Sequence, residues 1–314
     1  GVLVHQNDGN IYIRSRPAYT MWNIHMPAAG VPHLEGEIET LMRIVGEKRE
    51  NQCIWGFING VWNPKENALK SARLISDSTG GEQVLSMPND MLGWSDDVGV
   101  CILLKIGMDT PVVHLAVKFF KHLLFLSIES GVNLPIVVFA HSMGAIICEH
   151  ALELLPHQER QKIRIFTFGG GSFISPGKCH PDSHNFASAK DLICFCGSPN
   201  FRTLAMQRYI AIKEGLTHEQ MLEKWAREDS MLYLDTIDVR VIQNFEKQRI
   251  KYYEELLEKI CNVTILDSGP EYEHSFCNEC YQKEVQTLIE KYKKISKPVT
   301  IVTANTIAMD CVTV

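Results

Sequence analysis

Ser142 is the residue of this chain whose surroundings most clearly point to chemistry, and it lies in the segment PIVVFAHSMGA at residues 135–145. An apolar, β-branched run precedes the serine, and a segment with apolar residues at helical spacing follows it. The order strand, sharp turn, helix is the sequence form of a nucleophile elbow. The serine backbone is strained in such a turn, so small residues are needed two positions before and after it, here Ala140 and Gly144. We therefore expect Ser142 to be a nucleophile, and the alternative is that it only caps the helix.

A serine hydroxyl is a weak nucleophile at neutral pH, so it needs a base within hydrogen-bond reach and a carboxylate that orients the base. His274 is the best candidate for the base, because it follows the last expected strand by a short loop and precedes a helix. His150 and His157 lie on or at the end of the helix directly after Ser142, too close in sequence to fold back onto it. His218 lies inside a helical insertion. The alternative for His274 is a surface histidine at the start of a helix.

Asp191 is the expected acid, because it follows a strand and fits the order serine, acid, histidine along the chain. Two other aspartates remain open as alternatives. Asp182 lies in a loop rich in proline and histidine, and Asp267 ends the strand that precedes His274.

Attack by the serine would build an oxyanion, which needs preorganised hydrogen-bond donors. The first expected donor is the backbone N–H of Met143, directly after the serine. The second is the N–H of Val61, in a loop where Gly60 permits an unusual backbone turn. Gly60, Trp62 and His141 are second choices for oxyanion or pocket residues, and His141 is not the expected base because its side chain should point away from the serine. The alternative is that the Asn-Gly pair in this loop forms only a turn.

A zinc site at His274, Cys277 and Cys280 is a weaker alternative, suggested by the Cys-x-x-Cys spacing. A second cysteine pair at metal-ligand spacing is missing, because Cys194 and Cys196 lie in strand-like sequence. We therefore expect no metal and no organic cofactor.

Short apolar runs alternate with helical patterns along most of the chain, which predicts an α/β fold with a mostly parallel sheet and helices on both faces. Strands are expected at residues 53–58, 83–87, 136–140, 163–168, 185–188 and 261–266, and helices at 35–50, 64–75, 111–129 and 145–155. A hairpin is expected around Asn7-Asp8-Gly9.

Four candidate residues fall just beyond the carboxyl ends of expected strands, where ligands bind in such sheets. They are Gly60, Ser142, Asp191 and His274. This shared position predicts that they meet on one edge of the sheet.

Residues 1–200 and 261–314 are expected to form the core, and residues 201–260 a helical insertion. The insertion is long, charged and helical in period, which favours a cap or lid over the site. The alternative is an extra solvated helical layer.

The bulk composition excludes several classes of function. The chain has 314 residues, 45% of them hydrophobic, and a net charge of −6 without a basic stripe, so a nucleic-acid partner is not expected. No run of 18 apolar residues occurs, and lysines interrupt the nearest one, at residues 112–128, so no transmembrane segment is expected. No signal peptide begins at Gly1, although a targeting or membrane segment could have preceded it.

The ten cysteines include Cys53, Cys101 and Cys148 inside apolar patterns, as is typical of reduced, buried thiols. We expect a soluble protein in a reducing compartment, the bacterial cytoplasm or, after secretion, a host cytosol. Residues 298–314 alternate in polarity and predict a terminal strand that could join two copies of the chain.

Together these residues resemble the α/β-hydrolase superfamily, especially its lipase-like members. A closer resemblance is to an uncharacterised hydrolase-like family of chlamydial proteins, through the segments FINGVWNPKENALKSARLIS, HSMGA, ASAKDLICFCGSP and EHSFCNECY. The resemblance implies an α/β-hydrolase fold and a Ser-Asp-His site, but no particular substrate. The expected function is a serine hydrolase of the lipase or esterase type that cleaves a small or lipid-like ester, thioester or amide. The alternative is an inactive hydrolase fold used for binding or as a scaffold.

Overall fold

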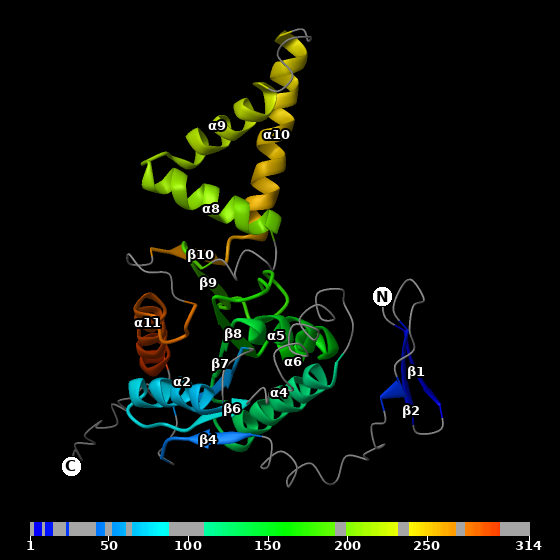
Figure 1. Ribbon diagram of the computed structural model, residues 1–314, viewed down its shortest axis with the longest axis vertical. Helices are drawn as coiled ribbons and strands as arrows, with labels where there is room; N and C mark the ends of the chain where they lie inside the picture. The colour runs from blue at the N-terminus through cyan, green and yellow to red at the C-terminus, as the bar shows by residue number, and fades with distance from the viewer. Residues whose placement is uncertain are drawn as a thin grey trace, which may run out of the picture.

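The centre of the protein is a seven-stranded, mostly parallel β-sheet, seen here in a computed structural model (Figure 1). The strands lie in the order β10-β9-β8-β7-β5-β6-β4; β4 pairs with β6 antiparallel, and the other neighbours pair in parallel. Along the chain they are β4 (Arg43–Val45), β5 (Ile54–Ile58), β6 (Val84–Met87), β7 (Ile136–His141), β8 (Ile163–Phe168), β9 (His184–Ser188) and β10 (Val263–Leu266). The structure describes residues 3–7, 10–14, 23–24, 42–47, 52–60, 65–87, 110–191, 199–231, 239–267 and 274–295.

Helices cover both faces of this sheet (Figure 1). Helices α2 (Lys65–Ser78) and α11 (Glu279–Ile295) pack on one face, and α4 (Pro111–Glu129) and α5 (Met143–Leu154) pack on the other. The short α6 (His157–Arg160) follows α5. The predicted fold class is therefore confirmed: the chain has an α/β-hydrolase fold.

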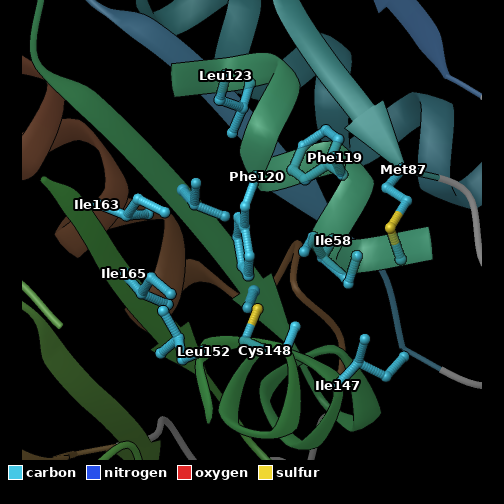
Figure 2. Packing of buried hydrophobic residues seen from close by; sticks show 14 of the residues in the cluster. Ile58, Met87, Phe119, Phe120, Leu123, Ile147, Cys148, Leu152, Ile163 and Ile165 are labelled. Carbon is cyan, nitrogen blue, oxygen red and sulfur yellow. The ribbon is translucent and has the colours of Figure 1, made fainter. Parts of the chain in front are cut away.

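The central strands are apolar along their whole length because both of their faces are buried. On β7, Val138 and Ala140 belong to the core under α4 and α5, whereas Val137 and Phe139 belong to the core under α2 and α11. Figure 2 shows the first of these cores, where side chains of the two helices pack onto the strands: Phe119, Phe120, Leu123, Ile147, Cys148 and Leu152 against Ile58, Ile163 and Ile165.

Helix α4 is, among the described residues, the one helix long and apolar enough to cross a membrane. In this structure, however, seven residues of α4 are buried, and its apolar side packs in the core. The amphipathic helix expected at residues 111–129 is thus present.

The helical pattern at residues 201–260 is present where the structure describes this segment, as α8 (Pro199–Lys213), α9 (His218–Met231) and α10 (Val239–Lys259). They share a separate apolar core that includes Trp225 and Leu257. Arg208 attaches α8 to the sheet, because its guanidinium donates to the carbonyl of Val263 in β10, at 2.5 Å. In Figure 1 these helices project beyond the β10 end of the sheet. Their role as a cap remains a prediction.

The prediction of a helix at residues 35–50 is wrong for residues 42–47, the part of this segment that the structure describes. Residues 43–45 form β4, an edge strand in which Ile44 pairs with Leu85 of β6. Gly46 ends this strand with a φ of +100°, next to the carbonyl of Glu82. The helical spacing of apolar residues was therefore overridden by pairing with a distant strand.

The N-terminal hairpin expected around Asn7-Asp8-Gly9 is confirmed. Strands β1 (Leu3–Asn7) and β2 (Asn10–Arg14) pair antiparallel, and β3 (Asn23–Ile24) extends them to a three-stranded sheet. The terminal strand expected at residues 298–314 lies outside the described residues.

Candidate active site

Ser142 lies at the point where the order of the strands reverses. From β5 the chain crosses to β6 on one side, returns to β7 on the other side, and continues from there to β8. In an open α/β sheet such a switch point leaves a crevice at the carboxyl ends of the strands, where ligands bind. Gly60 follows β5 and Ser142 follows β7, so both candidates lie at this crevice.

The backbone of Ser142 is strained, with φ of 56° and ψ of −123°. A positive φ is uncommon outside glycine, and among the described non-glycine residues only Asn133 shares it. Three backbone hydrogen bonds hold the turn: the Ser142 N–H donates to the carbonyl of Phe168 (3.2 Å), and its carbonyl accepts from Ala145 (3.1 Å) and Gly171 (2.9 Å). Strain that is held in this way is found at functional sites.

The small residues beside Ser142 are explained by the neighbouring strand. A Cβ added to Gly144 would lie 2.5 Å from the carbonyl oxygen of Ile58, at the end of β5. A Cβ added to Gly60 would lie equally close, 2.5 Å, to the Cβ of Ser142. The turn at Ser142 and the segment after β5 are therefore in close contact, through the backbone at Gly144 and through the side chain of Ser142 at Gly60.

The structure brings Ser142, His274 and Asp191 into one chain of hydrogen bonds. The Nε2 of His274 lies 2.9 Å from the Oγ of Ser142, and its Nδ1 lies 2.7 Å from the Oδ2 of Asp191. Because a carboxylate can only accept, Nδ1 carries the proton and Nε2 is left to accept from the serine hydroxyl. Asp191 follows β9 and His274 precedes α11, so three separate elements position the three side chains.

The two alternative acids have other partners. Asp182 accepts from the hydroxyl of Tyr292 (2.9 Å) and lies 3.5 Å from the ammonium of Lys291. Asp267 is exposed and pairs with Lys213 at 2.5 Å. Of the three aspartates, Asp191 is the one placed against the candidate base.

Tyr281 is a residue of this site that sequence reasoning missed. Its hydroxyl donates to the Oδ2 of Asp191 at 3.0 Å and accepts from the backbone N–H of Ser188, also at 3.0 Å. Gly169 makes room for this contact, because its Cβ would lie 2.7 Å from the carboxylate and 3.1 Å from the hydroxyl. The signal in the sequence was only partial: a helix was expected directly after His274, which brings its first turns near that histidine, but the contact of Tyr281 with Asp191 depends on tertiary packing.

His141 contacts the candidate base instead of the serine hydroxyl. Its Nε2 lies 3.1 Å from the carbonyl oxygen of His274, and since a carbonyl only accepts, this nitrogen carries the proton. The two imidazole rings are 4.9 Å apart, and the ring of Phe276 lies 5.9 Å from that of His141. Burial, and secondarily the nearby imidazole of His274, lower the pKa of His141 to about 3. His141 is therefore neutral at physiological pH.

The structure describes part of the expected oxyanion site. Met143 is the first residue of α5, and the N–H groups in the first turn of a helix point out of its positive end. Gly60 lies against Ser142, as described above. Val61 and Trp62 lie outside the described residues.

The alternative zinc site is not assembled in the part of the chain that the structure describes. Within it, no group of three His, Cys, Asp or Glu side chains could hold a metal ion. Both ring nitrogens of His274 are already engaged, with Asp191 and Ser142.

Comparisons with known proteins give only distant similarities. No protein-family model matches the chain, and no curated protein matches it. Similar solved structures include poly(aspartic acid) hydrolase-1 from Sphingomonas sp. KT-1, at 12% identity over 92% of this chain and 98% of that chain, with a TM-score of 0.42. A carboxylesterase of the archaeon Nitrososphaera gargenis is 14% identical over 81% of this chain and 82% of that chain, with a TM-score of 0.24. The resemblance to a chlamydial family is not supported by these comparisons.

Proposed function

We propose that the protein is a serine hydrolase of the lipase or esterase type, which cleaves an ester, thioester or amide through an acyl-enzyme on Ser142. One observation carries this proposal: the hydrogen-bond chain from the serine through His274 to Asp191, with distances of 2.9 and 2.7 Å. A nucleophile, a base and an orienting acid in this arrangement are the parts that acyl transfer requires. The alternative of an inactive hydrolase fold would predict that the three side chains lie apart.

In the proposed first step, His274 takes the proton of the Ser142 hydroxyl as the oxygen attacks the substrate carbonyl carbon. The negative charge moves to the carbonyl oxygen, which accepts from the N–H of Met143 and, in the proposal, from that of Val61. The intermediate then collapses, the bond to the leaving group breaks, and His274 returns its proton to that group.

In the second step, water replaces the leaving group. His274 removes a proton from the water while the water oxygen attacks the acyl carbon. The bond to Ser142 breaks, the serine regains its proton from His274, and the carboxylic acid is released. Asp191 keeps the Nδ1 of His274 protonated and oriented through both steps.

The proposed substrate is a small-molecule or lipid-like acyl compound, and the helical insertion is proposed to control its access. Helices α8, α9 and α10 lie in sequence between Asp191, which follows β9, and β10, which precedes His274. A cap inserted in sequence between the acid and the base is connected to both catalytic side chains, so its movement could change access to the site.

A fluorophosphonate probe tests the proposal, because it reacts much faster with an activated serine hydroxyl than with an ordinary one. We expect one phosphonate adduct on the peptide that contains Ser142, no adduct in Ser142→Ala, and much slower labelling in His274→Ala. A folded, unlabelled wild-type protein beside a labelled reference hydrolase would favour the inactive alternative. A panel of p-nitrophenyl esters of increasing chain length would then define the acyl group.

A further inference from the structure

The hydroxyl of Tyr281 lies between a backbone donor and the candidate acid. The N–H of Ser188 donates to this hydroxyl at 3.0 Å, so the single hydroxyl proton is directed to the Oδ2 of Asp191, also at 3.0 Å. Tyr281 and Asp191 are both fully buried. Hydrogen bonds to a buried carboxylate are charge-assisted and therefore stronger than neutral ones.

The same carboxylate oxygen serves two donors. The Oδ2 of Asp191 accepts from the Nδ1 of His274 at 2.7 Å and from the Tyr281 hydroxyl. The tyrosine ring is itself fixed, edge-on against Phe168 at 5.7 Å, and the glycine at 169 leaves space for its hydroxyl. Its position is thus set by β8 and β9 as well as by its own helix, α11.

We infer that Tyr281 is a positioning residue of this site, one that acts on His274 through Asp191: its hydroxyl donates to the Oδ2 of Asp191 that faces His274 and takes up part of the carboxylate charge. The inference rests on the proposed function, in which Asp191 orients the base. A donor on Oδ2 reduces the negative charge that His274 experiences, so it weakens the stabilisation of the protonated imidazole. Tyr281 thereby acts on His274 through the carboxylate of Asp191.

The groups that face His274 come from several elements. Asp191 follows β9, His141 and Ser142 come from the end of β7, and Tyr281 comes from α11. His141 is neutral at the pH values of the test, because burial lowers its pKa to about 3. The charge on Asp191 is therefore the one that Tyr281 can modulate.

The test replaces Tyr281→Phe and uses Tyr292→Phe as the matched control. Both tyrosines are buried on α11, and each donates to an aspartate, but Tyr292 bonds to Asp182, away from the site. The readouts are the midpoint of the His274 imidazole titration by NMR and the acid limb of the kcat/KM profile. In Tyr281→Phe we expect both to move upward by about 0.5 pH unit, with KM unchanged. In Tyr292→Phe both should stay at the wild-type value.

An unchanged or lowered midpoint in folded Tyr281→Phe would overturn the inference, as would an equal shift in the control. Should Tyr281→Phe not fold, 3-fluorotyrosine at position 281 replaces it. This residue keeps both hydrogen bonds but is a stronger donor, so the midpoint should move downward, and an unchanged or raised midpoint would again overturn the inference. The NMR midpoint needs no turnover. Failure of probe labelling at Ser142 would therefore refute the proposed function separately.

Discussion

Gly60 and Ser142 approach each other so closely that a Cβ on Gly60 would lie 2.5 Å from the Cβ of Ser142 and 3.0 Å from its Oγ. Real Cβ atoms essentially never come this close to another atom, so glycine is the residue that this contact allows. The loop after β5 is thus pressed against the candidate nucleophile. Val61, the expected second oxyanion donor, directly follows Gly60 in sequence.

Gly60→Ala should therefore damage the site more than the fold. The added methyl group must displace Ser142 or the loop, and we expect ester hydrolysis to fall on the order of 100-fold, as for loss of an oxyanion donor. The stability cost should be about 1–3 kcal/mol, as for overpacking. The measurements are kcat/KM with a short p-nitrophenyl ester and the melting temperature.

Gly131→Ala is the control for this substitution. Gly131 has a φ of +73° and nothing within 4 Å of an added Cβ, so alanine there costs about 1 kcal/mol of backbone strain without contacting the site. Full activity in Gly60→Ala would show that the loop after β5 can move away without loss of function.

Asp191→Asn should remove most of the activity, because an asparagine can present an N–H to His274 and leave it in the wrong tautomer. The expected loss in kcat is on the order of 10⁴-fold. Asp182→Asn is the control, because it removes a carboxylate charge beside Tyr292. Since Asp182 lies outside the proposed catalytic chain, kcat should stay within about 2-fold of wild type. Equal losses in the two variants would refute the assignment of the acid.

The sequence was sufficient to select the residues of this chain of hydrogen bonds, because each selection depended on order and local pattern. Small neighbours identified Ser142, and positions after expected strands identified Asp191 and His274, which the structure brings within hydrogen-bond reach. The central strands β5, β7 and β8 were readable for the same reason, since short continuous apolar runs are typical of parallel strands that are buried on both faces.

Contacts between distant segments could not be predicted in this way. Tyr281 meets Asp191 across 90 residues, and the meeting depends on how α11 is rotated against the sheet. Strand β4 was taken for a helix because its three residues form a strand only through pairing with β6. Local pattern identifies elements and loop residues, whereas tertiary packing decides which side chains of two elements touch.

His141 should make the folded protein sensitive to acid. Burial, and secondarily the imidazole of His274, lower its pKa to about 3, whereas an unfolded histidine has a pKa near 6.5. Between these values the unfolded chain binds a proton that the folded protein does not, so the free energy of unfolding falls as pH falls from about 6.5 to 3. His184, whose pKa burial and nearby cations lower to about 4, adds to the same trend.

His141→Phe should reduce the slope of the free energy of unfolding against pH. The slope should fall by up to about 1.4 kcal/mol per pH unit, which corresponds to one bound proton. The measurement is the free energy of unfolding from urea titrations at several pH values between 3.5 and 7. The exposed His157→Asn serves as the control and should keep the wild-type slope. If His141→Phe also kept it, the buried imidazole would not be the group that titrates.

Asp229 should hold α9 and α10 together within the insertion. Its Oδ2 accepts from the Nε of Arg249 (2.5 Å) and the hydroxyl of Tyr253 (2.8 Å), and its side chain is 28% exposed. Asp229→Asn weakens both bonds, and we expect a loss of about 1–2 kcal/mol, seen as faster hydrogen exchange in α9 and α10 with unchanged exchange in the sheet.

Lys224→Ala is the matched control, because it breaks the exposed pair of Lys224 and Glu214 and should cost at most about 0.5 kcal/mol. Faster exchange of β7 and β8 in Asp229→Asn would contradict the expectation, since it would mean that the insertion and the sheet open as one unit.

The same variant tests the proposed cap: a loosened cap should change KM for long-chain esters and leave KM for the acetate ester as in wild type. Equal changes for both esters would assign α8, α9 and α10 a structural role instead.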